Sequence, residues 1–175
     1  MQRGPQVPQF THCIEKFKPA FKTAVHFSCD AVSVFLFLSP GSYVHLQPQC
    51  KGLDRQLSSL EQIYAQCSSI FSHVVELRLQ GNGDPQVNQS KSWLRCLRPF
   101  NAVKTLYVSD CMSSELQVHI ARVLGELDRE GVAEVLPMLH TLIFRRFYII
   151  DKEVIPLLKP FIDARQQSGH PVAVK

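Results

Sequence analysis

The chain has 175 residues, of which 45 % are hydrophobic and 19 % are charged, and its formal net charge is +4. This balance indicates one folded domain with a sizeable core and excludes an intrinsically disordered chain. No run of lysine and arginine exceeds two residues, so the composition does not point to nucleic acid as a partner.

Residues 1–20 contain three prolines and no long apolar stretch, so they do not resemble a secretory signal. The longest apolar run, Val34 to Leu38, is too short to cross a membrane. We therefore expect a cytoplasmic or nuclear protein without a membrane partner. Residues 1–20 are expected to be irregular or to hold a short helix around 11–18, and residues 21–175 to form one domain.

The first part of this domain is predicted to contain two strands, a loop and a helix. Residues 24–27 and 31–38 are the apolar strands, and residues 39–52 hold the prolines and glycines of a loop or an edge segment. Asp54 is a suitable N-cap for the following helix. Six apolar residues at spacings of three and four predict the buried stripe of that helix: Leu57, Leu60, Ile63, Tyr64, Cys67 and Phe71.

A recurring apolar phrase organises the rest of the chain. It reads Phe71-x-x-Val74-x-x-Leu77-x-Leu79, then Phe100-x-x-Val103-x-x-Leu106-x-Val108, then Leu136-x-x-Leu139-x-x-Leu142-x-Phe144. The last two apolar residues of each copy are one residue apart, which sends both side chains to one face of a strand. From Leu77 to Leu106 is 29 residues and from Leu106 to Leu142 is 36, so a helix fits between the strands.

The remaining elements are predicted from this phrase and from helix boundary signals. The strands are residues 74–79, 103–108, 139–144 and finally 172–174. The helices have Ser90 or Ser92, then Ser113 or Ser114, then Asp151 as their caps. Gly131 is predicted to end the second of these helices. The last one covers 151–167, with Gly169 after its end and with Pro156 and Pro160 bending it or delaying its start.

Strands and helices thus alternate with short connections, which favours a parallel sheet covered by helices. The general leucine-rich pattern, L-x-x-L-x-L-x-x-N/C, is matched by two copies of the phrase, which end at Asn82 and Cys111. The third copy departs from it with Phe147. An earlier segment, Phe21-x-x-Ala24-x-x-Phe27, loosely echoes the phrase. We therefore predict an α/β fold: a short leucine-rich-repeat-like solenoid, with a mostly parallel sheet and helices on its outer face.

Longer segments resemble the leucine-rich-repeat region of F-box-like proteins of mushroom-forming fungi. The resemblance is found in Trp93-Leu94-x-x-Leu97-x-Pro99-Phe100-x-Ala102-Val103-Lys104-x-Leu106-Tyr107-Val108-Ser109, in Glu134-Val135-Leu136-Pro137-x-Leu139, in Leu57-Ser58-Ser59-Leu60 and in residues 161–174. It implies a substrate-recruiting module of a cullin-type ubiquitin ligase. Residues 1–20 are too few for an F-box, so the ligase adaptor is an expected partner only if an F-box lies upstream.

In a solenoid of this kind, the strand residues between the core positions face the concave side of the sheet. We expect this face to bind a protein ligand through nine residues: Glu76, Arg78, Gln80, Thr105, Tyr107, Ser109, Thr141, Ile143 and Arg145. Tyr107 is expected at the centre with Arg78 beside it, and these residue types dominate binding hot spots. Exposed strands at both ends of the sheet would also permit self-association.

The sequence names no cofactor, metal or catalytic residue. It has no Cys-x-x-Cys pair, and its seven histidines show no ligand spacing, so no metal site is predicted. The six cysteines are expected to be reduced and to pack in the core. Arg145-Arg146 beside Phe147-Tyr148 could stack RNA, but a basic strand end beside core aromatics explains them better. We expect a non-catalytic module; the alternative is a small α/β hydrolase or transferase.

Overall fold

The computed structural model describes residues 21–28, 31–39, 41–81, 90–110, 115–127, 129–145 and 150–175. Several sequence predictions lie outside the described residues. These are the helix around 11–18, the caps Ser113 and Ser114, the turn positions Asn82, Cys111 and Phe147, and the segment Arg146 to Tyr148.

The described residues form a seven-stranded sheet and a set of helices. The strands are β1 (Phe21–Phe27), β2 (Val32–Ser39), β3 (Ser42–Leu46), β4 (Val74–Gly81), β5 (Thr105–Asp110), β6 (Thr141–Arg145) and β7 (Ala173–Val174). The helices are α2 (Leu53–Gln66), α3 (Ser68–Phe71), α4 (Ser90–Leu97), α5 (Glu115–Gly125), α6 (Arg129–Glu134) and α7 (Ile150–Gln167).

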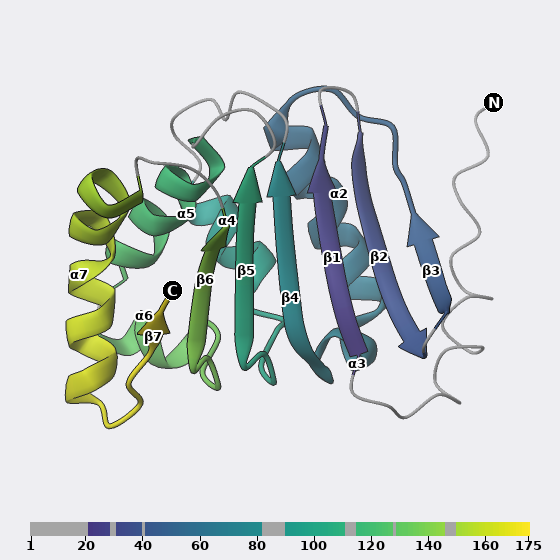
Figure 1. The fold of residues 1–175 in the computed structure, drawn as a ribbon. Coiled ribbons are helices and arrows are strands. Elements are labelled where there is room, and N and C mark those ends of the chain that lie inside the picture. The colour runs from purple at the N-terminus through teal and green to yellow at the C-terminus, as the bar shows by residue number, and fades with distance from the viewer. Residues whose placement is uncertain are drawn as a thin grey trace, which may run out of the picture.

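The strand order in the sheet is β3-β2-β1-β4-β5-β6-β7. Strands β1, β4, β5, β6 and β7 are parallel neighbours, whereas β2 and β3 pair antiparallel at the other end. Because crossovers between parallel strands are right-handed and this sheet grows in one direction, successive helices fall on the same side. The helices accordingly cover one face of the sheet, and the opposite face is turned to the viewer in Figure 1. The predicted α/β class and mostly parallel sheet are therefore confirmed.

The recurring phrase forms the core between the sheet and the helices. Leu77, Leu106 and Leu142 are paired in register across β4, β5 and β6, and all three are fully buried. The next core row follows the same register. Behind the strands, the rings of Tyr64 and Phe71 lie 4.5 Å apart edge to face. Alternate burial along strands with a shared register is what the phrase predicted.

The register of β1 contradicts the suggestion that residues 21–27 repeat the recurring phrase. That echo would align Ala24 with Val74, but the register pairs Ala24 with Arg78 and Thr23 with Leu77. Thr23 is buried and Ala24 lies on the opposite face. The apolar spacing was misleading because Ala24 and Phe27 are three residues apart, and residues at that spacing point to opposite faces of a regular strand. The segment 39–52, predicted as loop or edge, contains edge strand β3.

Helix boundaries also differ from the predictions. Asp54 is not the cap of α2, because Gly52 holds that position without a side-chain cap hydrogen bond and Asp54 lies in the first turn. The helix after β5 ends at Gly125, and Gly131 lies inside α6. Helix α7 begins at Ile150, before the predicted cap, and both of its prolines lie inside it.

The C-terminal end of the chain follows the prediction closely. Gly169 has φ of 79°, and its N–H donates to the Gln166 carbonyl, as expected just beyond a helix end. The short strand β7 then pairs in parallel with β6. Within the described ranges, no helix combines the length and apolar character that a membrane crossing would need.

Candidate binding face of the sheet

All nine residues of the predicted binding face lie on the side of the sheet that carries no described helix, which we call the helix-free face. They form three rows across β4, β5 and β6. The rows are Glu76–Thr105–Thr141, Arg78–Tyr107–Ile143 and Gln80–Ser109–Arg145. They face away from the core because they alternate along the strands with buried residues: Leu77, Leu79, Leu106, Val108, Leu142 and Phe144.

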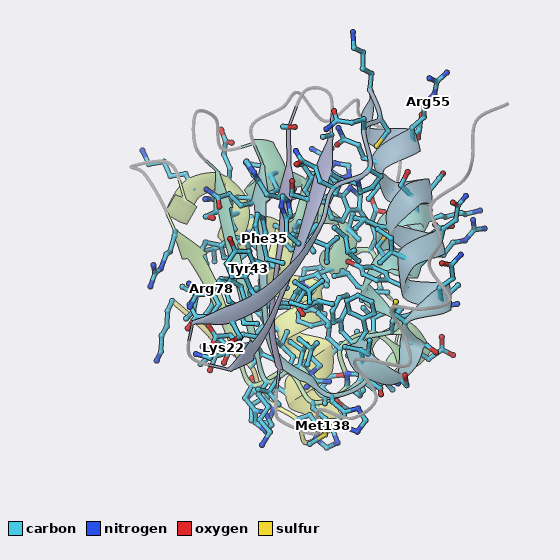
Figure 2. All side chains as sticks on the ribbon, turned by 90° about the vertical axis from the view of Figure 1, so that its right-hand side faces the viewer. Lys22, Phe35, Tyr43, Arg55, Arg78 and Met138 are labelled. Carbon is cyan, nitrogen blue, oxygen red and sulfur yellow. The ribbon has the colours of Figure 1, made fainter. Side chains whose placement is uncertain are left out.

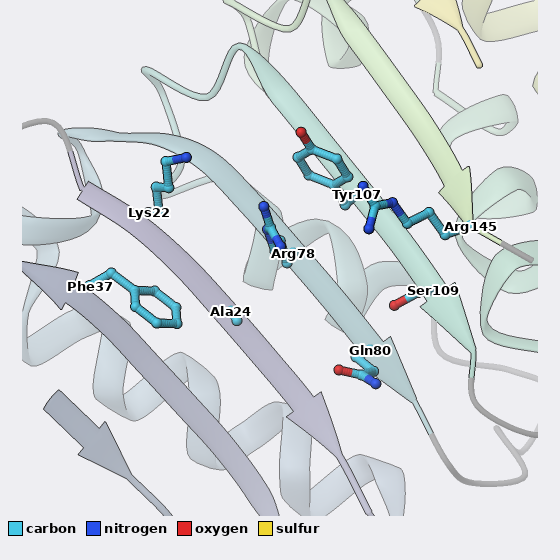
Figure 3. Close-up of a pocket in the computed structure, with 8 residues that line it drawn as sticks. All are labelled: Lys22, Ala24, Phe37, Arg78, Gln80, Tyr107, Ser109 and Arg145. Carbon is cyan, nitrogen blue, oxygen red and sulfur yellow. The ribbon is translucent and has the colours of Figure 1, made fainter. Parts of the chain in front are cut away.

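Tyr107 lies between two guanidinium groups on neighbouring strands. The guanidinium carbon of Arg78, on β4, is 4.7 Å from the centroid of the Tyr107 ring. That of Arg145, on β6, is 5.5 Å from the same centroid. Both distances fall within the range of cation–π attraction, which favours a cation over an electron-rich ring. The ring thus helps to hold both cations at the centre of the helix-free face (Figure 3).

Glu76 pairs with two of the cations on this face. Its carboxylate accepts from Lys22 Nζ at 2.8 Å, and from Arg78 Nη2 at 2.6 Å and Nε at 3.0 Å. Burial raises the pKa of this carboxyl, but the hydrogen bonds and charges of Lys22 and Arg78 outweigh burial and leave the pKa below its ordinary value. Glu76 is therefore ionised at neutral pH and fixes Lys22 and Arg78 in place.

A depression of about 490 Å³ is hollowed into the helix-free face. Its lining consists of Lys22, Ala24, Phe37, Arg78, Gln80, Tyr107, Ser109 and Arg145. Ala24 stands between Phe35 of β2 and Arg78 of β4 in the register, so a small side chain there leaves space among longer ones. Figure 3 shows Phe37 and Ala24 on one side of this hollow, with Tyr107 and Arg145 on the other.

Five of the nine predicted residues line the depression, and Glu76 is bonded to two residues of its lining. Thr105, Thr141 and Ile143 lie on the same face outside it. Sequence reasoning missed Lys22, Ala24 and Phe37. The alternation of β1 could have suggested the first two, because Thr23, Val25 and Phe27 are its buried residues. Their place beside Arg78, however, depends on the pairing of β1 with β4.

Next to the depression, β2 and β3 carry a ledge of rings, which we define as Phe35, Phe37, Tyr43 and His45. Phe35 stacks on His45 with centroids 4.2 Å apart and planes 5° apart, and Phe37 lies 6.2 Å from Tyr43. The Phe37 side chain is 41 % exposed and Tyr43 is 59 % exposed. Figure 2, viewed from the β3 side, shows Phe35 and Tyr43 on the side of the sheet away from the helix of Arg55.

The two buried thiols that the structure describes, Cys67 and Cys96, are poorly suited to nucleophilic chemistry. Burial and the charge of Glu61 raise the pKa of Cys96 to about 12, and its thiol donates to the Leu57 carbonyl. Burial also raises the pKa of Cys67. A reactive cysteine needs a lowered pKa, so neither thiol has the required environment. Cys50, Cys67 and Cys96 are free rather than disulfide-bonded, and the described residues include no cluster of three metal-ligating side chains.

Comparison with known proteins does not assign a function to the chain. No family model and no curated protein matches the chain. Among solved structures it is similar to T. thermophilus RuvC in complex with a Holliday junction substrate, at 9 % identity and a TM-score of 0.33. The match covers 87 % of this chain and 98 % of the other. A TM-score of that size carries no conclusion about function.

Proposed function

We propose that this chain is a non-catalytic protein-binding module and that its helix-free face holds an acidic segment of a partner protein. The observation that carries the proposal is Tyr107 between the guanidinium groups of Arg78 and Arg145, beside a depression in an uncovered sheet face. Tyrosine and arginine are enriched among the residues that dominate binding energy. An open sheet face offers them to a partner on rigid strands.

Charge complementarity supports an acidic occupant. The depression is lined by three cations, Lys22, Arg78 and Arg145, and by no carboxylate. The nearby Glu76 neutralises one of these positive charges and pairs with Lys22 and Arg78. Among the described residues, no ion pair is found for Arg145. A partner carboxylate can therefore complete the pairing, and charge-assisted hydrogen bonds to arginine are among the stronger ones in proteins.

The order of strands and helices along the chain supports the proposal that the fold is a short leucine-rich-repeat-like solenoid. β4, β5, β6 and β7 follow one another in sequence and in the sheet, and helical segments lie in each connection. A leucine-rich-repeat module builds its sheet in this way. In this solenoid, the antiparallel strands β2 and β3 extend one end of the parallel sheet. We propose that the chain recruits a substrate protein, as the repeats of an F-box protein do. The free described thiols fit a cytoplasmic or nuclear location.

Peptide selection tests the proposed face directly. Ten-residue peptides that bind the wild-type chain would be selected from a random library, and their affinities compared with those for the double variant Arg78→Ala, Tyr107→Ala. We expect a loss of at least about tenfold, the usual effect of removing a charge-assisted hydrogen bond. The melting temperature should fall by less than a core substitution would cause, because neither side chain belongs to the core and Glu76 keeps its pair with Lys22 when Arg78 is removed.

Lys159→Ala is the matched control for the loss of a surface cation. Lys159 is exposed on α7 and pairs with Asp163, away from the helix-free face. This variant should bind the selected peptides as the wild type does. Selected peptides that bind the double variant and the wild type equally well would show that the helix-free face is not the binding site.

A further inference from the structure

The depression has two chemically different sides. On one side Ala24 leaves a gap beside the exposed ring of Phe37, and the ledge of rings continues onto β3. On the other side Arg78 and Arg145 lie over Tyr107. A ligand that fills the whole depression must therefore present an apolar group to the first side and an anion to the second.

The apolar side favours a flat side chain. Phe37 is 41 % exposed, and its ring lies within 6.2 Å of Tyr43 in a tilted arrangement. A third ring placed over Ala24 would cover part of Phe37 and remove apolar area from water, which favours binding. Aromatic rings also attract one another at centroid separations of about 4.5–7 Å. Because the Ala24 side chain is a single methyl group, a ring placed over it meets no bulky side chain on the surface of the sheet.

The cationic side favours a carboxylate near Arg145. Glu76 already accepts hydrogen bonds from Lys22 and Arg78, so these two cations are partly satisfied. Arg145 lies on the far side of Tyr107 from Arg78. A carboxylate placed at the Arg145 guanidinium, beside the Tyr107 ring, would pair with Arg145 and stay farther from Glu76. The negative charge of Glu76 would repel a second anionic group of the ligand placed beside Lys22 and Arg78.

The separation of the two sides sets the spacing in the ligand. Ala24 on β1 and Tyr107 on β5 are separated by two strand spacings, which is about 10 Å. An extended peptide rises about 3.3 Å per residue, and its alternate side chains share a face. Side chains two or four residues apart on a peptide that crosses the strands therefore bracket this distance.

Resting on the proposed function, we infer that the partner segment carries an acidic residue and an aromatic residue two or four positions apart. The aromatic ring packs over Ala24 against Phe37, and the carboxylate pairs with Arg145 beside Tyr107. The ligand class is thus an extended acidic–aromatic peptide. Neither an acidic nor an aromatic residue alone fills both sides of the depression.

The experiment uses pools of ten-residue peptides, with all but two positions randomised. One set fixes Glu and Phe at a spacing of two or four, and matched sets replace Glu by Gln or Phe by Ala. For the wild-type chain we expect the Glu–Phe pools to bind about tenfold more tightly than either matched set, as one charge-assisted contact or one buried ring predicts. Equal binding of all the pools would overturn the inference.

Two single variants separate the contributions of the two sides. Arg145→Gln should lose the preference for Glu over Gln and keep the preference for Phe over Ala. Ala24→Leu fills the apolar side without changing any charge, so it should lose the preference for Phe and keep that for Glu. Leucine is acceptable at this half-buried strand position, and the melting temperature checks that the fold is intact. If each variant lost both preferences to the same extent, the two-sided assignment would be wrong.

A further arm distinguishes this inference from the proposed function. Selected peptides that are acidic and lose affinity in the double variant Arg78→Ala, Tyr107→Ala, but carry no aromatic residue two or four positions from the acidic one, would contradict the inference and leave the proposed function standing. A single-stranded polyuridylate probe is tested in parallel. If it bound the helix-free face more tightly than the Glu–Phe pools, the inference and the peptide-binding function would both fail.

Discussion

Arg165 is a buried cation that fastens α7 to the turn before β6. Its side chain is 2 % exposed, with Nη1 donating to the Pro137 carbonyl at 3.0 Å and Nη2 to the Leu139 carbonyl at 2.7 Å. Burial lowers its pKa. The guanidinium satisfies two carbonyls at once, which a lysine with its single nitrogen would do less well.

Replacing Arg165 should therefore destabilise the fold. We expect Arg165→Met to lower the free energy of unfolding by about 2–4 kcal/mol, because one buried and one half-buried carbonyl lose their donors. Urea unfolding measures the change, and Gln166→Ala at the exposed neighbouring position provides the control. An unchanged midpoint in Arg165→Met would mean that these two hydrogen bonds do not stabilise the protein.

Glu76 gives the helix-free face a defined pH dependence. Its pKa in the folded chain lies below its ordinary value of 4.5, so ionised Glu76 stabilises the fold at higher pH. That contribution is complete above the ordinary pKa and is lost as the pH falls through the lower, folded-state value. Glu76→Gln should therefore lose less stability than the wild type when the pH falls from about 6 to about 3.

Urea unfolding at a series of pH values tests this dependence. Lys22→Met should give an intermediate result, because it removes one of the two partners that lower the Glu76 pKa. If the wild type and Glu76→Gln lost the same stability on acidification, the carboxylate pairing would have no thermodynamic effect.

Helices α5 and α7 meet closely where α5 ends. A Cβ atom added at Gly125 would collide with the backbone carbonyl oxygen of Leu157, and backbone atoms cannot give way as a flexible side chain can. Alanine at an open helix site would gain roughly 0.5–1 kcal/mol over glycine, but overpacking usually costs about 1–3 kcal/mol. Gly125→Ala should therefore lower the melting temperature, whereas Ser58→Ala, exposed on α2, should not. A more stable Gly125→Ala variant would contradict the close contact.

The same contact explains why the sequence failed to predict the end of α5. Gly125 and Gly131 are both plausible terminators by residue type alone. The approach of α7 makes glycine necessary at position 125, and that constraint comes from a segment about 30 residues further along the chain. In contrast, the strands of the recurring phrase were predictable, because a buried strand shows its alternation locally in its own residues.

At the scale of the whole molecule, strand periodicity was enough to predict which face of the sheet the nine residues occupy. It was not enough to predict which residues line the depression. Tyr107, Arg78 and Arg145 were expected on one face because each is next to an apolar core position of the recurring phrase, and successive side chains of a strand point to opposite faces. Ala24 and Phe37 joined them only through the pairing of β1 with β4 and with β2. The strand order and the pairing of β1 with β4 depend on contacts between segments far apart in the chain, so the alternation within one strand does not reveal them.

Backbone amide NMR tests most directly whether the helix-free face binds an acidic–aromatic peptide. The labelled chain is titrated with a peptide selected from the Glu–Phe pools. We predict that the largest shifts fall on β1, β4, β5 and β6, around Ala24, Arg78, Tyr107 and Arg145. Shifts confined to α5 and α7, with these strand amides unchanged, would contradict it.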